Sequence, residues 1–367
     1  MKIDLLNFIG VAVALLIGTP IKADGNAVQG SVEVRVQRLL GKPIISPQLD
    51  PSIGPNIQGP SLIRVPEWIE EPLGKYYLYF ADHKGSYIRL AYADALTGPW
   101  KIHAPGTLQL YQTGFPQQPQ DLSPAQLNAL KEKFRAMGVD VDSFPHDPLK
   151  ELTTPHIASP DVHVDHDNRR ILMYYHGLKA PGQQVTRVAV SNDGISFTSR
   201  DEDLGKTYMR TFAHREQTFA LAMPGQIYRS EDGIRNFESG PRLFNKDMRH
   251  AGLLKRNNTL YVFWTQVGHV PERILLSYID ISGPWTGWQE SEPVEVLRPG
   301  SSWEGADAPL EPSIRSVAYG HVNQLRDPYV FEEDGRTYLL YTVAGESGIG
   351  IAAVQLPNSV SEDGIPP

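Results

Sequence analysis

The fold is decided by the stretch Leu325-Arg-Asp-Pro-Tyr-Val-Phe-Glu-Glu-Asp-Gly-Arg-Thr-Tyr-Leu-Leu-Tyr-Thr-Val-Ala-Gly-Glu-Ser-Gly-Ile-Gly-Ile-Ala-Ala-Val354. β-Branched and aromatic residues at 329–331 and 337–342 predict two strands, and Glu333-Asp334-Gly335 between them is a tight-turn signal. A third run begins at Ile349, after a glycine-rich loop. The stretch therefore predicts an antiparallel unit of strand, hairpin, strand, loop and strand.

Similar units precede this one, and two turn motifs recur among them. Thr97-Gly-Pro-Trp100 returns as Ser282-Gly-Pro-Trp285, and Ser191-Asn-Asp-Gly-Ile195 returns as Ser230-Glu-Asp-Gly-Ile234. All four motifs fall between the third and fourth strands of a unit, and turns repeated at a fixed position are typical of repeat folds. The sequence therefore predicts an all-β protein, a five-bladed β-propeller. An irregular β-sandwich is the alternative, because strand spacing alone suits that fold too.

The ends and one insertion divide the chain further. Residues 1–23 have a lysine at position 2 and an apolar run too short for a comfortable membrane span, which predicts a cleavable signal peptide. Residues 24–55 hold an alternating strand and a loop, and we expect this strand to close the last sheet. The propeller is predicted over 56–367, with a helical insertion at about 101–155 whose helix begins at Ser123 and ends before Gly138.

Composition and charge exclude some partners. The formal net charge is −8, and removing the leader, which carries a net +1, leaves −9. This balance argues against nucleic acid. The chain has no cysteine, so an exported protein of this sequence rests on its core rather than on disulfides. We expect a secreted or periplasmic protein with no stable membrane span after signal removal.

Propeller topology brings distant residues to one face. In a four-stranded antiparallel blade, the start of the first strand, the loop between the second and third strands and the link to the next blade share a face. An aspartate beside a proline is often a turn residue, but clustered carboxylates raise one another's pKa and let one serve as an acid. The predicted catalytic candidates are Asp161, Asp327, Glu304, Glu272 and Glu346. The predicted substrate-binding residues are Gln58, Asp82, His83, His176, Arg249, His250, Arg326 and Trp303.

Several motifs carry a family resemblance. The openings Ser159-Pro-Asp-Val162 and Arg326-Asp-Pro-Tyr-Val330, and Gly-Pro-Trp at the unit ends, resemble the furanosidase-type five-bladed propellers of glycoside hydrolase family 43, of which this chain looks like a divergent member. The resemblance covers roughly 56–354. It implies an aspartate base opening the first blade, a modulating aspartate opening the second and a glutamate acid from the third. Asp161 matches the second position, whereas Gln58-Gly-Pro-Ser61 stands where the first belongs and the third blade lacks Glu-Gly-Pro.

The expected activity is cleavage of glycosidic bonds in an oligo- or polysaccharide by carboxylate acid/base chemistry. By position, Asp327 is the expected base, Glu304 or Glu272 the acid and Asp161 the modulator, while Trp303 is expected to stack on a sugar. Arg249, His250 and Arg326 are expected to bind an anionic group of the glycan, or phosphate in a phosphorolysis.

Two alternatives stay open beside this activity. One is a carbohydrate-binding propeller that has lost catalysis, because the first-blade aspartate is missing. The other is a metal-dependent enzyme in which His83, His176 and His250 hold an axial ion, although no cofactor is required by the preferred reading.

Overall fold

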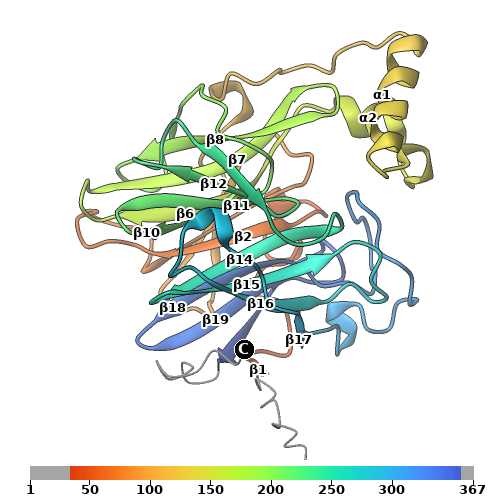
Figure 1. Ribbon diagram of the computed structural model, residues 1–367. Coiled ribbons are helices and arrows are strands. Elements are labelled where there is room, and N and C mark those ends of the chain that lie inside the picture. The colour runs from red at the N-terminus through yellow and green to blue at the C-terminus, as the bar shows by residue number, and fades with distance from the viewer. Residues whose placement is uncertain (1–33, 357–367) are drawn as a thin grey trace, which may run out of the picture. The chain divides into compact units, whose positions relative to one another are not determined.

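The computed structural model describes residues 34–356, so the leader expected at 1–23 lies outside the described residues, as does 357–367. The described part contains five four-stranded antiparallel sheets arranged as the blades of a propeller (Figure 1). The predicted five-bladed β-propeller is confirmed, and the β-sandwich alternative is wrong.

The blades follow the chain, each starting with its innermost strand. Blade 1 comprises β2 (Gln58–Arg64), β3 (Tyr76–Ala81), β4 (Arg89–Ala93) and β5 (Lys101–His103). Blade 2 comprises β6 (Ile157–Asp165), β7 (Arg170–Ala180), β8 (Gln183–Ser191) and β9 (Thr198–Ser199). Blade 3 comprises β10 (Arg210–His214), β11 (Gln217–Ala222), β12 (Gln226–Ser230) and β13 (Glu238–Arg242). Blade 4 comprises β14 (Met248–Arg256), β15 (Thr259–Gln266), β16 (Ile274–Asp280) and β17 (Val294–Leu297).

Blade 5 joins the two ends of the described chain. It comprises β18 (Arg326–Glu333), β19 (Arg336–Thr342), β20 (Ile349–Gln355) and β1 (Arg35–Arg38). The strand β1 pairs antiparallel with β20, with Val36 opposite Val354. The ring is therefore closed by hydrogen bonds between its first and last strands, which leaves β20 without a bare edge.

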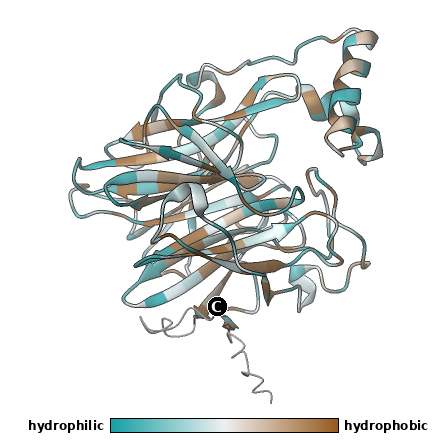
Figure 2. Cartoon of the chain, in the orientation of Figure 1, coloured by the Kyte–Doolittle hydropathy of each residue, from teal (hydrophilic) through white to brown (hydrophobic). Residues whose placement is uncertain are grey.

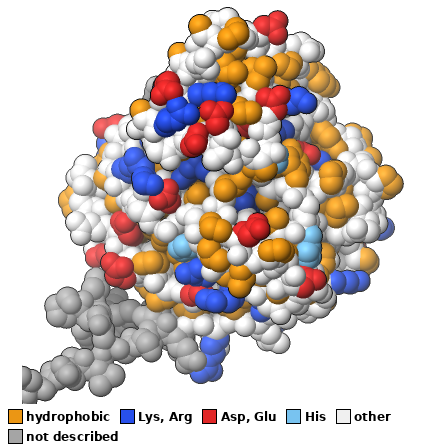
Figure 3. Space-filling model, turned by 90° about the vertical axis from the view of Figure 1, so that its right-hand side faces the viewer, with side chains coloured by type: hydrophobic (Ala, Val, Ile, Leu, Met, Phe, Trp, Pro, Cys, Tyr) orange, Lys and Arg blue, Asp and Glu red, His pale blue; other side chains and the backbone are white. Residues whose placement is uncertain are grey.

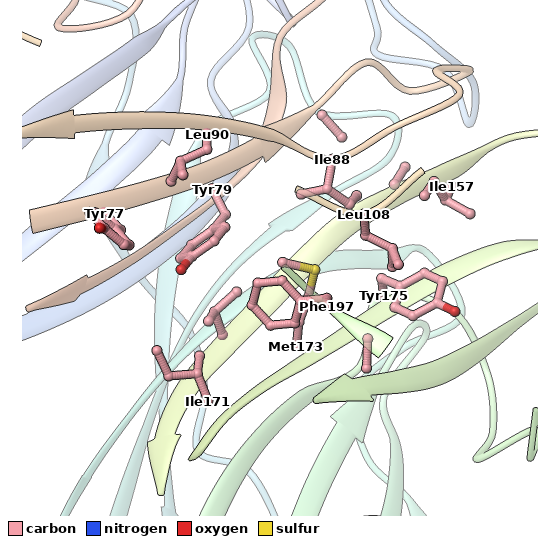
Figure 4. Close-up of a cluster of buried hydrophobic side chains, with 14 of the residues drawn as sticks. Tyr77, Tyr79, Ile88, Leu90, Leu108, Ile157, Ile171, Met173, Tyr175 and Phe197 are labelled. Atoms are coloured by element: carbon pink, nitrogen blue, oxygen red, sulfur yellow. The ribbon is translucent and has the colours of Figure 1, made fainter. Parts of the chain in front are cut away.

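Apolar side chains fill the space between neighbouring blades. Five clusters of buried residues were found in the described part, one for each pair of adjacent blades. Figure 4 shows the cluster between blades 1 and 2, where Tyr79 and Leu90 of one blade meet Met173 and Tyr175 of the next. Figure 2 shows the same pattern over the described chain, with hydrophobic residues along the strands and hydrophilic ones at the turns. Blade-to-blade packing therefore fixes the radial arrangement of the sheets.

The insertion between blades 1 and 2 carries two helices, α1 (Pro124–Ala136) and α2 (Pro148–Thr153). The predicted helix is α1, and Ser123 caps it as expected, in a capping box with Gln126. The sequence reading missed α2, although Asp147 caps it and a proline follows. Short 3-10 turns lie at Pro51–Ile53, Leu110–Gln112, Val141–Ser143, Trp285–Gly287 and Ser302–Glu304. No helix within 34–356 combines the length and apolarity that a membrane span requires.

Candidate functional site

One residue at the opening of each inner strand has a left-handed backbone. These residues are Gly59, Ser159, Tyr208, His250 and Asp327, with φ of 62°, 52°, 54°, 37° and 46°. In four blades the pairing of the inner strand with its neighbour shifts register at this point. Because a bulge re-aims the side chain that it carries, these five positions form one set around the axis, which we call the axial ring.

The axial ring holds one carboxyl group, that of Asp327. The openings of blades 1, 2 and 3, where the family resemblance implies acids, carry Gly59, Ser159 and Tyr208 at this position. Asp161 comes two residues after Ser159, beyond the register shift of β6 against β7. The aspartate follows the proline in Ser159-Pro-Asp161, whereas it precedes the proline in Asp327-Pro328. The acid of blade 2 therefore lies further along its inner strand than Asp327 does in blade 5.

Asp327 is buried in a polar environment that opposes its ionisation. Burial, followed by the charge of Glu346, raises the pKa of Asp327 to about 6. The Thr342 hydroxyl donates to Oδ2 at 3.3 Å, and His250 Nδ1 lies 3.2 Å from Oδ1. His250 Nδ1 accepts a hydrogen bond from the Asp327 N–H at 3.4 Å, so this nitrogen carries no proton that it could donate to Oδ1. Asp327 Oδ1 therefore lacks a hydrogen-bond partner among the described residues. The Asp327 carboxyl is thus suited to hold a proton near neutral pH.

Glu346 is held in the opposite state. It accepts hydrogen bonds from Asn56 Nδ2 at 2.8 Å and Arg326 Nη1 at 2.9 Å, and His83 Nδ1 lies 3.2 Å away. Burial opposes its ionisation, but His83 and Arg326 outweigh burial and lower the pKa of Glu346. This carboxylate stays ionised and supplies the negative charge that Asp327 experiences.

Glu272 is a third buried carboxylate of this cluster. It lies 3.2 Å from Arg326 Nε and 3.7 Å from Arg249 Nη1. Neither contact is aligned as a hydrogen bond, so both oxygens of Glu272 lack a partner among the described residues. Two guanidinium groups therefore face Glu272 while its oxygen lone pairs stay without a hydrogen-bond donor among the described residues.

The two arginines also anchor the linker that precedes blade 5. Arg249 Nη1 donates to the Ile314 carbonyl at 2.8 Å, and Arg326 Nη1 donates to the Ser316 carbonyl at 3.0 Å. We call residues 313–318 the strap, since they cross over the buried cluster. Figure 3 shows this face of the molecule, with acidic, basic and apolar side chains intermixed. The arginines predicted to bind an anionic substrate group are thus engaged by backbone carbonyls.

Tyr208 lies between the histidines of the cluster. Its ring centroid is 4.7 Å from that of His176, 4.6 Å from that of His250 and 6.3 Å from that of His83. Burial, the largest cause, lowers the pKa of both His176 and His250 well below the usual value, so both rings are neutral. In the described part no group of three or more histidines and acids is arranged to hold a metal. The phenol ring separates the three imidazoles that a metal site would need together.

Unpaired polar atoms concentrate in this cluster. Both ring nitrogens of His176, the Tyr208 hydroxyl and Gln58 Nε2 are buried without a hydrogen-bond partner among residues 34–356. Asp327 Oδ1 and both Glu272 oxygens add to them. Buried polar atoms in native proteins are usually paired, and a concentration of unpaired ones is characteristic of a place where polar ligands bind. We call these side chains, together with Glu346, Arg249, Arg326, His250 and His83, the axial cluster.

Other predicted site residues lie elsewhere. Asp161 accepts a hydrogen bond from Thr211 N at 2.8 Å and pairs with His163 Nε2 at 2.7 Å, and it lines a separate cavity. Glu304 accepts from Arg38 Nε at 2.7 Å and from the Tyr341 hydroxyl at 3.0 Å, so it ties β1 to the linker.

The last two predicted side chains have local contacts. Trp303 packs against the apolar cluster between blades 4 and 5. Asp82 accepts from Lys84 N at 2.8 Å within its own loop.

Sequence reasoning missed Tyr208, Ser159 and Asn56 as members of the site. Tyr208 stands in the least regular unit, two residues before β10 begins. Asn56 binds Glu346 from the linker that enters blade 1. Tyr208 lies two residues before the first paired position of β10, and Ser159 lies two residues before the position at which pairing of β6 resumes after its register shift, positions that only the strand register reveals.

The sequence has a viral relative. It is 36% identical over 329 residues to "Uncharacterized protein R118" of Acanthamoeba polyphaga mimivirus, covering 82% of this chain and 84% of that protein. No family profile matches the sequence.

Solved structures share the fold at low identity. One, from a study of GH130 glycoside hydrolases that target β-1,2 mannosidic linkages in Candida mannan, has a TM-score of 0.55 and 14% identity, covering 90% of this chain and 96% of that chain. The GH43 β-xylosidase/α-arabinofuranosidase CoXyl43 from a compost microbial metagenome, bound to xylotriose, has a TM-score of 0.52 and 11% identity, covering 89% of this chain and 96% of that chain. A GH43_1 enzyme from Xanthomonas citri, complexed with xylotriose, has a TM-score of 0.52 and 10% identity, covering 87% of this chain and 92% of that chain. The expected resemblance to a divergent propeller of this type is confirmed at the level of fold.

Proposed function

We propose that this chain, which belongs to the family of the Acanthamoeba polyphaga mimivirus protein R118, is a glycan-active enzyme that cleaves glycosidic bonds at the axial cluster. The observation that carries the proposal is the unlike surroundings of two buried carboxyl groups, Asp327 and Glu272. Asp327 has its pKa raised to about 6, while Glu272 lies between two guanidinium groups. Glycoside hydrolysis needs one carboxyl that holds a proton and one that is ionised.

In this proposal Asp327 protonates the oxygen of the leaving sugar. Glu272, which faces two guanidinium groups, is the partner that activates water or stabilises the positive charge developing on the ring carbon. Glu346, whose oxygens are bonded to Asn56 and Arg326, keeps the pKa of Asp327 high rather than reacting itself. These roles reverse the ones expected from the sequence, in which Asp327 is the base and Glu272 a candidate acid. They also replace the roles of Asp161 and Glu304, which lie in other contacts.

Access to the axial cluster requires the strap to move. Asp327, Glu272 and Glu346 are each at most 1% exposed, and the strap carbonyls of Ile314 and Ser316 are bonded to the arginines beside them. A sugar reaches the carboxyl groups when these two hydrogen bonds open.

The test is turnover of short oligosaccharides by the full chain. Xylotriose and β-1,2-linked manno-oligosaccharides are suitable substrates, because fold relatives were solved with the former or target the latter. We expect Asp327→Asn and Glu272→Gln each to lower kcat by about 10²–10⁴-fold, the usual contribution of a positioned acid or base. Wild-type turnover should decline above about pH 6, as Asp327 loses its proton.

The matched control is Asp334→Asn, in the exposed turn of the β18–β19 hairpin of the same blade. It should turn over like the wild type. Full activity in Asp327→Asn would refute the proposal. Addition of inorganic phosphate tests phosphorolysis, which would release a sugar phosphate in place of free sugar.

A second candidate function is glycan binding without turnover. It is favoured by the absence of carboxyl groups at the ring positions of blades 1 to 3, which carry Gly59, Ser159 and Tyr208. Retention of an oligosaccharide by the wild type with no product over hours, and equal retention by Asp327→Asn, would support this function instead.

A further inference from the structure

A cavity lies along the propeller axis, apart from the axial cluster. It has a volume of about 240 Å³ and is lined by the inner strands β6, β10, β14 and β18, at residues that follow the ring positions along each strand. Its polar lining includes Asp161, His163, Arg210 and Lys255, and its apolar lining includes Phe212 and Tyr329. The strap does not border it.

One wall of this cavity holds the buried Asp161 carboxylate together with His163 and Arg210, which lie close to it. Asp161 is 2% exposed and lies 2.7 Å from His163 Nε2 and 3.8 Å from Arg210 Nη1. Burial opposes ionisation of Asp161, but His163 and then Arg210 outweigh it, so the pKa of Asp161 is lowered and the group is anionic. Arg210 is itself 2% exposed and donates to the carbonyls of Pro160 at 2.6 Å and Ala251 at 3.0 Å. The Asp161 charge is therefore already balanced by groups of the wall.

Lys255 is left as a surplus cation. Among residues 34–356 no carboxylate lies within 4 Å of its ammonium group, whereas the next residue, Arg256, pairs with Glu332. The cavity is thus lined by two permanent cations and one carboxylate, with an imidazole that is 38% exposed beside them. Its charge favours an anion, and the rings of Phe212 and Tyr329 favour an organic body over a bare ion.

We propose that this cavity binds a small organic carboxylate of monosaccharide size, with its carboxylate at Lys255 and His163 and its body against Phe212. The site is independent of the proposed catalysis, because none of its lining residues belongs to the axial cluster. The ligand class is recognised by charge at one end and by apolar contact at the other.

The experiment is calorimetric titration of the full chain with glucuronate, and with glucose as a neutral analogue. We expect saturable binding of glucuronate and at least tenfold weaker binding of glucose. Lys255→Gln should weaken glucuronate binding about tenfold or more, as expected for loss of one charge-assisted hydrogen bond. Arg215→Gln is the matched control, since Arg215 is exposed in the neighbouring β10–β11 hairpin and does not line the cavity.

Asp327→Asn separates this site from the catalytic one. It should bind glucuronate as the wild type does, even where it has lost turnover. Equal binding of glucose, an equal loss in Arg215→Gln, or no measurable binding of glucuronate would overturn the proposal. Loss of glucuronate binding in Asp327→Asn would place the ligand at the axial cluster and would overturn it as well.

Discussion

The Asp327 carboxyl couples protonation to stability. The folded protein holds this proton up to about pH 6, whereas an unfolded aspartate releases it near the ordinary value of 3.8. Through this group the unfolding free energy of the wild type falls as pH rises from about 4 to about 6, and it is level above that range. Glu346 acts in the opposite sense, since its lowered pKa contributes stability that is lost as pH falls below its ordinary value of 4.5.

Asp327→Asn is expected to remove the first of these dependences. The stability of the variant relative to the wild type should therefore increase between pH 4.5 and pH 7, by on the order of 1–3 kcal/mol. Denaturant unfolding of both proteins at the two pH values measures this difference. Parallel pH profiles would mean that the Asp327 pKa is not raised.

Gly59 is a ring position at which no side chain fits. Its φ is 62°, and a Cβ built there would lie 2.8 Å from the Ser159 Cα. Gly59→Ala should destabilise the fold by about 2 kcal/mol or more, because backbone strain and a backbone clash add. Gly41→Ala, where a Cβ meets nothing within 4 Å, is the control and should stay within about 0.5 kcal/mol. Thermal unfolding of the two variants decides the point, and equal melting temperatures would contradict it.

Gly59 also shows why this site could be predicted only in part from the sequence. The repeat turns Asp193-Gly194 and Asp232-Gly233 were found because local rules fix them, and both glycines indeed have positive φ. The ring positions depend on register shifts against the neighbouring strand, which no local pattern records. The sequence therefore predicts Asp161 and Asp327 on one face, whereas within residues 34–356 the two carboxyls share no hydrogen-bond or ion-pair partner.

Among the elements, the strap is held by the insertion as well as by the two buried arginines. His146, from the insertion, lies 3.2 Å through Nε2 from the Val317 carbonyl, and its ring centroid is 4.9 Å from that of Tyr319. His146→Ala removes both contacts and leaves the buried arginines in place. We expect amide hydrogens of the strap to exchange several-fold faster, while global stability changes by less than about 1 kcal/mol.

Hydrogen exchange followed by mass spectrometry measures this effect. His321→Ala is the control, because His321 pairs with exposed Asp307 and makes no contact with the strap carbonyl. Unchanged protection of the strap in His146→Ala would show that the arginines alone hold it.

The helix α1 shows how an element can be predicted better than its packing. Ser123, Pro124 and Gly138 define its ends from sequence, and the capping box confirms its start. Leu130 and Phe134 of this helix lie close to Gly182 of the β7–β8 hairpin, yet no residue of α1 is buried and Met137 is 55% exposed. Amphipathic periodicity predicts a helix, whereas burial depends on the partner that the insertion happens to reach.

At the scale of the whole molecule, closure through β1 is the contact that makes five sheets a ring. β1 adds Val36 to the apolar cluster between blades 4 and 5, and Arg38 bonds Glu304 at 2.7 Å. A chain that starts at residue 40 loses this strand and leaves β20 as a bare edge. We expect its melting temperature to fall by about 5 °C or more, together with greater aggregation on heating.

Calorimetry and light scattering of the shortened and full chains test this expectation. Deletion of residues 357–367, which lie beyond β20, is the matched truncation and should have a smaller effect. Equal melting temperatures of the full chain and the chain that starts at 40 would show that blade 5 is complete without β1.

The pairing of Arg35 with Gln355 also sets a constraint on biosynthesis. The first strand leaves the ribosome long before its partner is translated, at a pace of roughly 5–20 residues per second. For that interval the nascent polypeptide holds incomplete blades whose joining surfaces are uncovered. Blade 5 can therefore be completed only after β20 has been synthesised, although β1 is among the first strands made.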